Sequence, residues 1–228
     1  MCKALPHYNT IINAFNLGEV APMLYYLIET SSLPLASIEK DFAIDSTGLS
    51  TSKFFRWHTA KYGDTRLLNK RDWIKIHAVC GVKTNIVTAI DVGNRYSADN
   101  WYFQPLVQKT AQKFTINEVS ADKAYSSEKN MQTVFDLGGM PYIAFRNNAS
   151  AKGSTTGAVW RNMYHYYSLN QERFLQHYHK RSNAETTFSM IKAKFGDYLR
   201  SKTETAQINE ALCKVLAHNI CVLITSIH

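Results

Sequence analysis

Residues 73–92 read WIKIHAVCGVKTNIVTAIDV, which is two apolar runs joined by the turn-like residues KTN. Every second residue of the first run is apolar, so one face of an extended chain would carry Ile74, Ile76, Ala78, Cys80 and Val82. The opposite face would carry Trp73, Lys75 and His77. Alternation with a period of two is typical of a strand that packs one face on a core. The pattern therefore predicts a β-hairpin.

The segments on either side of this hairpin extend it to an α/β domain. DFAID, residues 41–45, precedes it as a short strand, and Gly138-Gly139 is a typical helix stop further along the chain. The elements expected after the hairpin are a helix over 99–113, a strand over 116–122, a helix over 126–137, a strand over 141–145, and helices from 171 onwards, the last starting near 203. Three early strands followed by alternating helices and strands predict a mixed five-stranded sheet flanked by helices, an RNase H-like arrangement.

The chain of 228 residues suits one large domain with a small addition. We expect a short helical segment over residues 1–38 and the α/β domain over residues 39–228. Residues 147–170 are rich in Ser, Gly and Asn and then aromatic, and we expect them to form an insertion before the last helices.

Positive charge is concentrated in two segments. The net charge is +8, while residues 51–80 carry seven Lys/Arg against two Asp/Glu, and residues 171–202 carry seven against three. Two basic segments favour a polyanionic partner such as DNA or RNA. The alternative is a generically basic soluble protein.

Composition excludes several other classes of protein. Apolar residues make up 45% and charged residues 19%, which excludes a disordered chain. The sequence has no run of 18 apolar residues and no recognisable secretory signal, so we expect no membrane span and a cytoplasmic location. Its four cysteines lack C-x-x-C and zinc spacing, which favours free thiols.

A polar edge is predicted on a late helix, within YHKRSNAETTFSMIK (178–192). On one continuous helix, four of its side chains would fall within about 60° of arc; they are Tyr178, Arg181, Glu185 and Lys192. A neighbouring apolar stripe would dock the helix and consists of Ala184, Phe188, Ile191 and Phe195. The alternative for the polar edge is an ordinary solvated face with one i,i+4 ion pair.

Two aspartates are placed where expected strands end. Asp45 closes the first strand and Asp122 the fourth, and these strands are neighbours in an RNase H-like sheet. The docked helix would add Glu185. Three converging carboxylates need counter-charge, and Mg²⁺ or Mn²⁺ favours oxygen ligands. Two such ions can activate a water or a 3′-hydroxyl and stabilise a leaving oxygen. The alternative is that each aspartate only forms a turn or a cap.

The motifs AIDSTG, WIKIHAVCGVKTNIVTAIDV, VSADKAYSS and Tyr178-x2-Arg181-x3-Glu185-x6-Lys192 together resemble those of insertion-sequence DDE transposases with a Tyr-Arg-Glu-Lys signature. The resemblance extends from about residue 41 to residue 226. It implies metal-dependent DNA strand cleavage and strand transfer, with Asp45, Asp122 and Glu185 as catalytic and metal-binding residues. It also implies that Tyr178, Arg181 and Lys192 contact the backbone or an extruded base of double-stranded DNA, which a homodimer would hold. The same resemblance implies a prokaryotic protein, found at the nucleoid when DNA is bound.

Further residues are expected to contact DNA: Lys61, Arg66, Lys70, Lys123 and Trp160. Trp160 would stack on an unpaired base, the alternative being that it packs onto the domain. His77 is a possible supporting residue near Asp45. Only 44 residues precede Asp45, which favours a truncated DNA-binding remnant as one alternative function. A structure-selective nuclease of the same fold is a second alternative.

Overall fold

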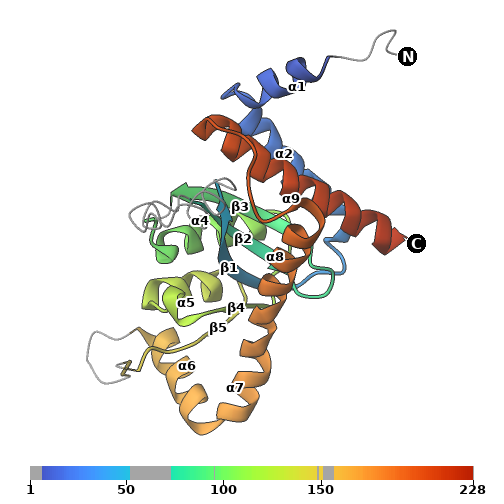
Figure 1. The fold of residues 1–228 in the computed structure, drawn as a ribbon. Helices are drawn as coiled ribbons and strands as arrows, with labels where there is room; N and C mark the ends of the chain where they lie inside the picture. The colour runs from blue at the N-terminus through green and yellow to red at the C-terminus, as the bar shows by residue number, and fades with distance from the viewer. Residues whose placement is uncertain (1–6, 52–72, 95, 148, 151–156, 228) are drawn as a thin grey trace.

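The fold is known from a computed structural model, which describes residues 7–51, 73–94, 96–147, 149–150 and 157–227. These residues form a five-stranded sheet of order β3-β2-β1-β4-β5 (Figure 1). Its strands are β1 Asp41–Ser50, β2 Trp73–Gly81, β3 Val87–Asn94, β4 Glu118–Ala121 and β5 Met140–Ile143. The first three strands are antiparallel to one another, whereas β4 and β5 are parallel to β1. The predicted mixed sheet of an RNase H-like domain is confirmed.

The hairpin β2–β3 forms as the alternation predicts. Ile76, Ala78 and Cys80 are buried in one core cluster, while Val79 is buried in a second cluster on the opposite face. The turn places Asn85 at φ 62°, a left-handed conformation that Asn adopts more readily than most residues. Local sequence therefore determines both the strands and the turn that reverses them.

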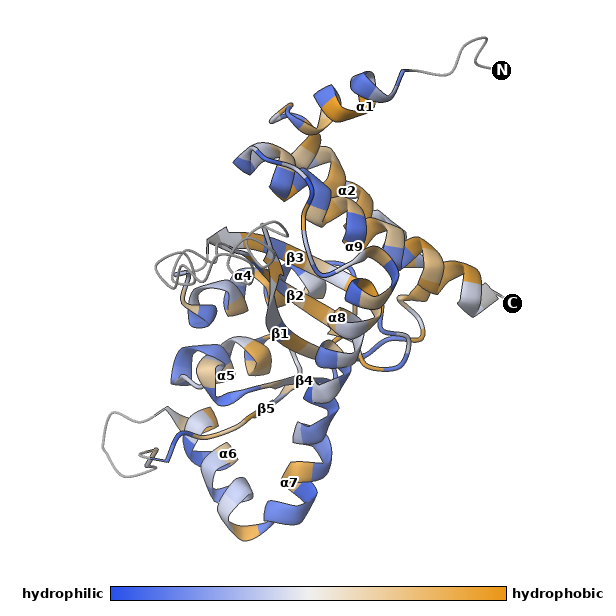
Figure 2. Ribbon diagram, in the orientation of Figure 1, coloured by the Kyte–Doolittle hydropathy of each residue, from blue (hydrophilic) through white to orange (hydrophobic). Residues whose placement is uncertain are grey.

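Helices cover both faces of the sheet. They are α1 Tyr8–Phe15, α2 Val20–Ser32, α4 Asp99–Ala111, α5 Glu128–Asp136, α6 Ala158–Leu169, α7 Gln171–Tyr178, α8 Ser182–Phe195 and α9 Glu204–Ile227, with short 3-10 turns η1 Leu33–Leu35, η3 Lys123–Tyr125 and η4 His179–Arg181. One core cluster joins the sheet to α4, α5, α6 and α7, and the other joins it to α2, α8 and α9. Figure 2 shows hydrophobic residues along the strands and along α2 and α9, whereas α7 is mostly polar.

The helix α9 is a core helix that runs beside α2 (Figure 1). Judged by length and composition alone, α9 is long and apolar enough to cross a membrane. Its Leu212 and Val215 are buried in the core with Ile28 of α2. The buried amide of Asn219 donates to the Ile28 and Val87 carbonyls and accepts from the Val87 N–H, so it links α9 to α2 and β3. The described cysteines, Cys80, Cys213 and Cys221, are free thiols.

Two elements differ from the expected boundaries. The strand β1 continues to Ser50 rather than ending at Asp45, because its antiparallel partner β2 pairs with it through Ser50 and Trp73. The expected insertion contains the helix α6, whose Val159 and Met163 are buried in the core. The division into a segment 1–38 and a domain 39–228 remains a prediction, and Leu24 of the N-terminal segment is part of the core.

Candidate active site

The register of β1 and β4 places the two aspartates next to each other. The parallel pairing ends with Ile44 opposite Ala121, and Asp45 and Asp122 are the next residue of each strand. Residues in register on parallel strands point to the same face of the sheet. Asp45 lies opposite Ala78 of β2, whose side chain is buried in the cluster beneath α8 and α9. Asp45 therefore faces α8, and Asp122 directly follows the end of β4 beside it.

The helix α8 docks through the predicted apolar stripe. Ala184, Phe188 and Ile191 are at most 5% exposed and share a cluster with Ala43 and Leu49 of β1. This burial confirms the predicted docking face.

α8 also runs in the same direction as β1. Lys180, just before the helix, contacts Asp41 at the start of the strand, and Lys192 donates to the Thr47 hydroxyl at 2.7 Å. Tyr198 then bridges to Ser50 in parallel. Glu185 therefore comes alongside the middle of β1, where Asp45 lies.

Electrostatics place Asp45 in a carboxylate-rich environment. Burial is the main cause that raises the pKa of Asp45 to about 6, and the negative charges of Asp122 and Glu185 raise it further. A hydrogen bond from the Ser46 N–H, 2.8 Å, and the Arg181 guanidinium act in the opposite direction. Asp122 also accepts a hydrogen bond from the Ala124 N–H and so caps η3.

The polar edge is present, but not on one continuous helix as predicted. Tyr178 ends α7, Arg181 lies in the 3-10 turn η4, and Glu185 lies in the first turns of α8. The Arg181 guanidinium lies 5.5 Å from the centre of the Tyr178 ring, and its Nη1 lies 2.7 Å from Oε1 of Glu185. The Glu185 side chain is 53% exposed, so the edge borders solvent.

The three carboxylates offer the donor chemistry of a hard divalent cation. They are all oxygen donors, and their mutual repulsion around Asp45 is what a cation would relieve. Among the described residues, no three His, Cys, Asp or Glu side chains stand around a common point as a metal site would need. Glu185 is paired with Arg181 and Asp122 with its own turn, so these contacts would have to give way to a cation.

A basic pocket adjoins Asp122. Its volume is about 390 Å³, and it is lined by Asp122, Lys123, Ala124, Arg146 and Asn147. The Arg146 side chain donates to the carbonyls of Lys123 and Ala124. Lys123 was predicted to contact DNA, whereas Arg146 was not singled out from the sequence. The one sequence feature that could have indicated Arg146 is its position directly after the apolar strand pattern PYIAF, residues 141–145. The predicted DNA-binding residues Lys61, Arg66 and Lys70 lie outside the described residues.

Trp160 makes packing contacts with its own domain. Its ring meets Phe145 edge-on at a centroid distance of 5.0 Å, and its Nε1–H donates to the Ser150 carbonyl at 3.0 Å. Tyr164 and Tyr167 of the same helix also contact Phe145. These contacts agree with the packing alternative considered above, and a base-stacking role stays a prediction.

His77 lies on the other face of the sheet, so the expectation that it approaches Asp45 is wrong. It pairs in register with Ser46, the neighbour of Asp45, and neighbours along a strand point to opposite faces. The fully buried His77 ring stacks on Tyr102 at 3.9 Å, and its Nδ1 is 3.4 Å from Asp99. Burial lowers the pKa of His77 to about 4.

Protonation linked to His77 should lower the free energy of unfolding of the protein in mild acid. Because its pKa is about 4 in the folded chain against 6.5 ordinarily, the unfolded chain takes up a proton first as the pH falls. We expect this group to cost about 2 kcal/mol of unfolding free energy between pH 7 and pH 5. His77→Phe keeps an aromatic ring and removes the titration, so its urea midpoint should fall less over this range. An identical pH dependence in both proteins would contradict the assignment.

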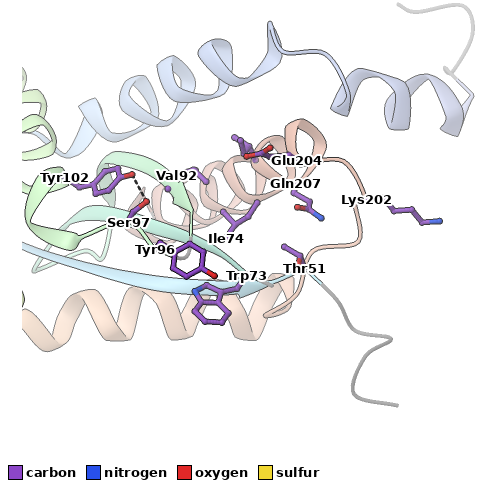
Figure 3. A pocket seen from close by; sticks show the side chains of 12 residues that line it. Thr51, Trp73, Ile74, Val92, Tyr96, Ser97, Tyr102, Lys202, Glu204 and Gln207 are labelled. Carbon is purple, nitrogen blue, oxygen red and sulfur yellow. Dashed lines mark hydrogen bonds between the residues drawn. The ribbon is translucent and has the colours of Figure 1, made fainter. Parts of the chain in front are cut away.

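A larger pocket of about 810 Å³ lies away from the aspartates. Figure 3 shows its lining from β2, β3, the loop before α4 and the start of α9. Trp73, Tyr96, Lys202 and Gln207 are among the lining residues, and Tyr102 donates to Ser97 at its edge. None of the three predicted metal-binding carboxylates lines it.

Comparison with known proteins gives two findings. Residues 37–220 match the family model described as "Transposase DDE domain". Over 215 residues the chain is 25% identical to a protein of Archaeoglobus fulgidus described as "Probable transposase for insertion sequence element ISA1214". That alignment covers 93% of this chain and 62% of the archaeal protein, so the chain spans less than two thirds of that relative's length.

Proposed function

Because this chain belongs to the transposase DDE domain family, we propose that it catalyses metal-dependent DNA strand cleavage and strand transfer. One observation carries the proposal: the parallel pairing of β1 and β4 ends with Ile44 opposite Ala121, so Asp45 and Asp122, the residues that follow, come next to each other. The negative charge of Glu185, on α8, helps to raise the pKa of Asp45. We propose these three residues as the ligands of two Mg²⁺ or Mn²⁺ ions.

Two divalent ions, when bound, supply a strongly activated water or 3′-hydroxyl and stabilisation of the leaving oxygen. The protein's part is to bring the ligands together on rigid elements. With its pKa near 6, Asp45 is mostly ionised at neutral pH and becomes protonated below that value. Protonation of Asp45 competes with metal binding, so at subsaturating Mg²⁺ cleavage should weaken as the pH falls through about 6.

We further propose that Arg181, Lys192 and Tyr178 hold the DNA backbone beside the carboxylates. Arg181 presents a planar fork of donors suited to phosphate, and it is already directed along the polar edge by Glu185. Lys192 extends over β1 to Thr47, two residues beyond Asp45. A phosphate taken up by Arg181 would leave Glu185 available to a cation. The homodimer that would hold the DNA, and the cytoplasmic location, remain part of this proposal.

A nicking and joining assay tests the proposed function. The protein would be incubated with Mg²⁺ and DNA that carries the ends of the element. Joined products are expected if the chain is a transposase, with an Asp122→Asn protein as the inactive reference. Nicked products alone would indicate a nuclease of the same fold. DNA binding without any cleavage would indicate a truncated remnant, and would contradict the proposal.

Salt dependence tests the basic segment 51–80. Protein that neutralises DNA phosphates loses affinity linearly in log–log against salt, by about 0.9 per phosphate. Changing Lys61, Arg66 and Lys70 together to Gln should therefore flatten the slope by roughly 2 to 3. Lys113→Gln is the control, because this exposed lysine lies after α4, near the start of β4 and away from Asp122. An unchanged slope in the triple variant would show that these three residues do not contact DNA.

A further inference from the structure

A cluster of charged side chains fixes the junction between α7 and α8. Nζ of Lys180, in the turn η4, lies 2.8 Å from Oδ2 of Asp41 and 2.7 Å from Oε1 of Glu118. The other Glu118 oxygen lies 2.6 Å from Nδ1 of His177, the last-but-one residue of α7. The His177 ring in turn stacks on Tyr142 of β5 at 4.3 Å. Three strands and two helical segments thus meet around these four side chains. We call Lys180, Asp41, Glu118 and His177 the junction cluster.

The positive charge of Lys180 compensates the negative charges of two carboxylates that the fold brings together. Asp41 and Glu118 are register partners at the start of β1 and β4, and their side chains are only 20% and 9% exposed. Burial alone would lower the pKa of Lys180, but its contacts with these two carboxylates raise it, so the lysine stays charged. Removal of the ammonium group would leave two partly buried carboxylates facing each other without a shared counter-charge.

The junction cluster is tied to the proposed ligands by short covalent spans. Asp41 precedes Asp45 by four residues within β1, and Glu118 precedes Asp122, the residue directly after β4, by the same number. Lys180 directly precedes Arg181 and stands five residues before Glu185. The same lysine therefore connects the segment that carries the third carboxylate to both strands that carry the other two.

From this geometry we infer that Lys180 is a positioning residue, which sets where Arg181 and Glu185 stand relative to Asp45 and Asp122. The contacts of Lys180 do not depend on the proposed function, but their effect on metal binding rests on it. The turn η4 replaces the α-helical hydrogen-bond pattern between α7 and α8 with one 3-10 turn, a form that often marks a hinge, so the direction of α8 depends on the contacts made there. Ala184, Phe188 and Ile191 hold α8 against the sheet and Lys192 anchors a later turn, while Lys180 holds the turn η4 that precedes the helix.

The test compares Lys180→Met with Lys180→Arg in the full chain, with Lys109→Met as a matched control. Lys109 also pairs with a glutamate, Glu29, and its side chain is 37% exposed against 32% for Lys180, but it lies on α4. Two measurements are made below the melting temperature of all variants. They are amide hydrogen exchange over residues 177–187 and the binding of Mn²⁺ followed by electron paramagnetic resonance.

Lys180→Met is expected to speed exchange over residues 177–187 at least about tenfold without changing α9, and to weaken Mn²⁺ binding about tenfold or more, the loss typical of a mutated ligand-orienting residue. Lys180→Arg should restore both to within about threefold, and Lys109→Met should change neither. The double variant Lys180→Met/Glu118→Gln, which also removes a carboxylate left unpaired, should regain stability but not Mn²⁺ affinity.

Unchanged exchange in Lys180→Met would overturn the inference whatever the protein does to DNA. Faster exchange with wild-type Mn²⁺ affinity would reduce the junction cluster to a structural contact and also overturn it. Recovery of Mn²⁺ affinity in the double variant would also overturn the inference. If the wild-type chain itself bound no Mn²⁺, the proposed metal site would fail, while the exchange measurement would still decide whether Lys180 fixes η4.

Discussion

Glu185→Gln should abolish cleavage and strand transfer, with a loss on the order of 10³-fold or more. The change keeps the size of the side chain and removes the charge that a hard cation needs from its oxygen ligands. DNA binding should be retained, because the contacts proposed for DNA come from Arg181 and Lys192. Joined and nicked products would be quantified at saturating Mg²⁺, with Glu172→Gln, an exposed change on α7, as the control.

Asp45→Asn and Asp122→Asn should lose activity to a similar extent, and combining them with Glu185→Gln should add little, since ligands of one site act as a unit. Stability gives an independent readout. The folded-state pKa of Asp45 is about 6 against 3.8 ordinarily, so ionising this residue costs folding free energy once the pH exceeds 3.8. Without metal at neutral pH, Asp45→Asn should therefore melt no lower than wild type. A Glu185→Gln protein that cuts DNA at the normal rate would leave the polar edge as a solvated helix face.

Phe188→Ala should destabilise the protein by about 3 to 5 kcal/mol. The Phe188 side chain is 5% exposed and packs with Ile191 and Ala184 against the sheet, and truncation leaves a cavity that these neighbours cannot fill. A lower urea midpoint with an unchanged slope would report this loss. Phe188→Leu, which keeps most of the volume, should cost roughly 1.5 kcal/mol or less.

The Phe188→Ala variant also separates the packing of α8 from its part in the DNA reaction. If Phe188 only docks α8, the fraction of Phe188→Ala that stays folded at low temperature should cleave DNA with a modest loss, far smaller than that of Glu185→Gln. A Phe188→Ala protein as stable as the wild type would contradict the docking of α8 by this stripe. An activity loss as large as that of Glu185→Gln in fully folded protein would show that the helix position is much less tolerant than the packing suggests.

The sequence by itself determined the elements and their inward faces. The hairpin of residues 73–92, the helix stop at Gly138 and the apolar stripe of α8 are local patterns, because side chains a few residues apart repeat with the period of a strand or a helix. Burial follows from the same pattern, since the apolar face of each element has to leave water. The pairing of the first and fourth strands could also be anticipated, but only from the order of elements in this fold class.

Tertiary structure alone decided the contacts between distant residues. The length of β1 past Asp45 depends on its partner β2, and the register between the two strands pairs His77 with Ser46, so that His77 does not share the face of Asp45. The break at η4 and the placement of Lys180 between Asp41 and Glu118 join residues up to 139 positions apart. Periodicity carries no information on such pairings, because the free energy that selects them comes from packing and charge compensation between elements, which exist only when the sheet has assembled.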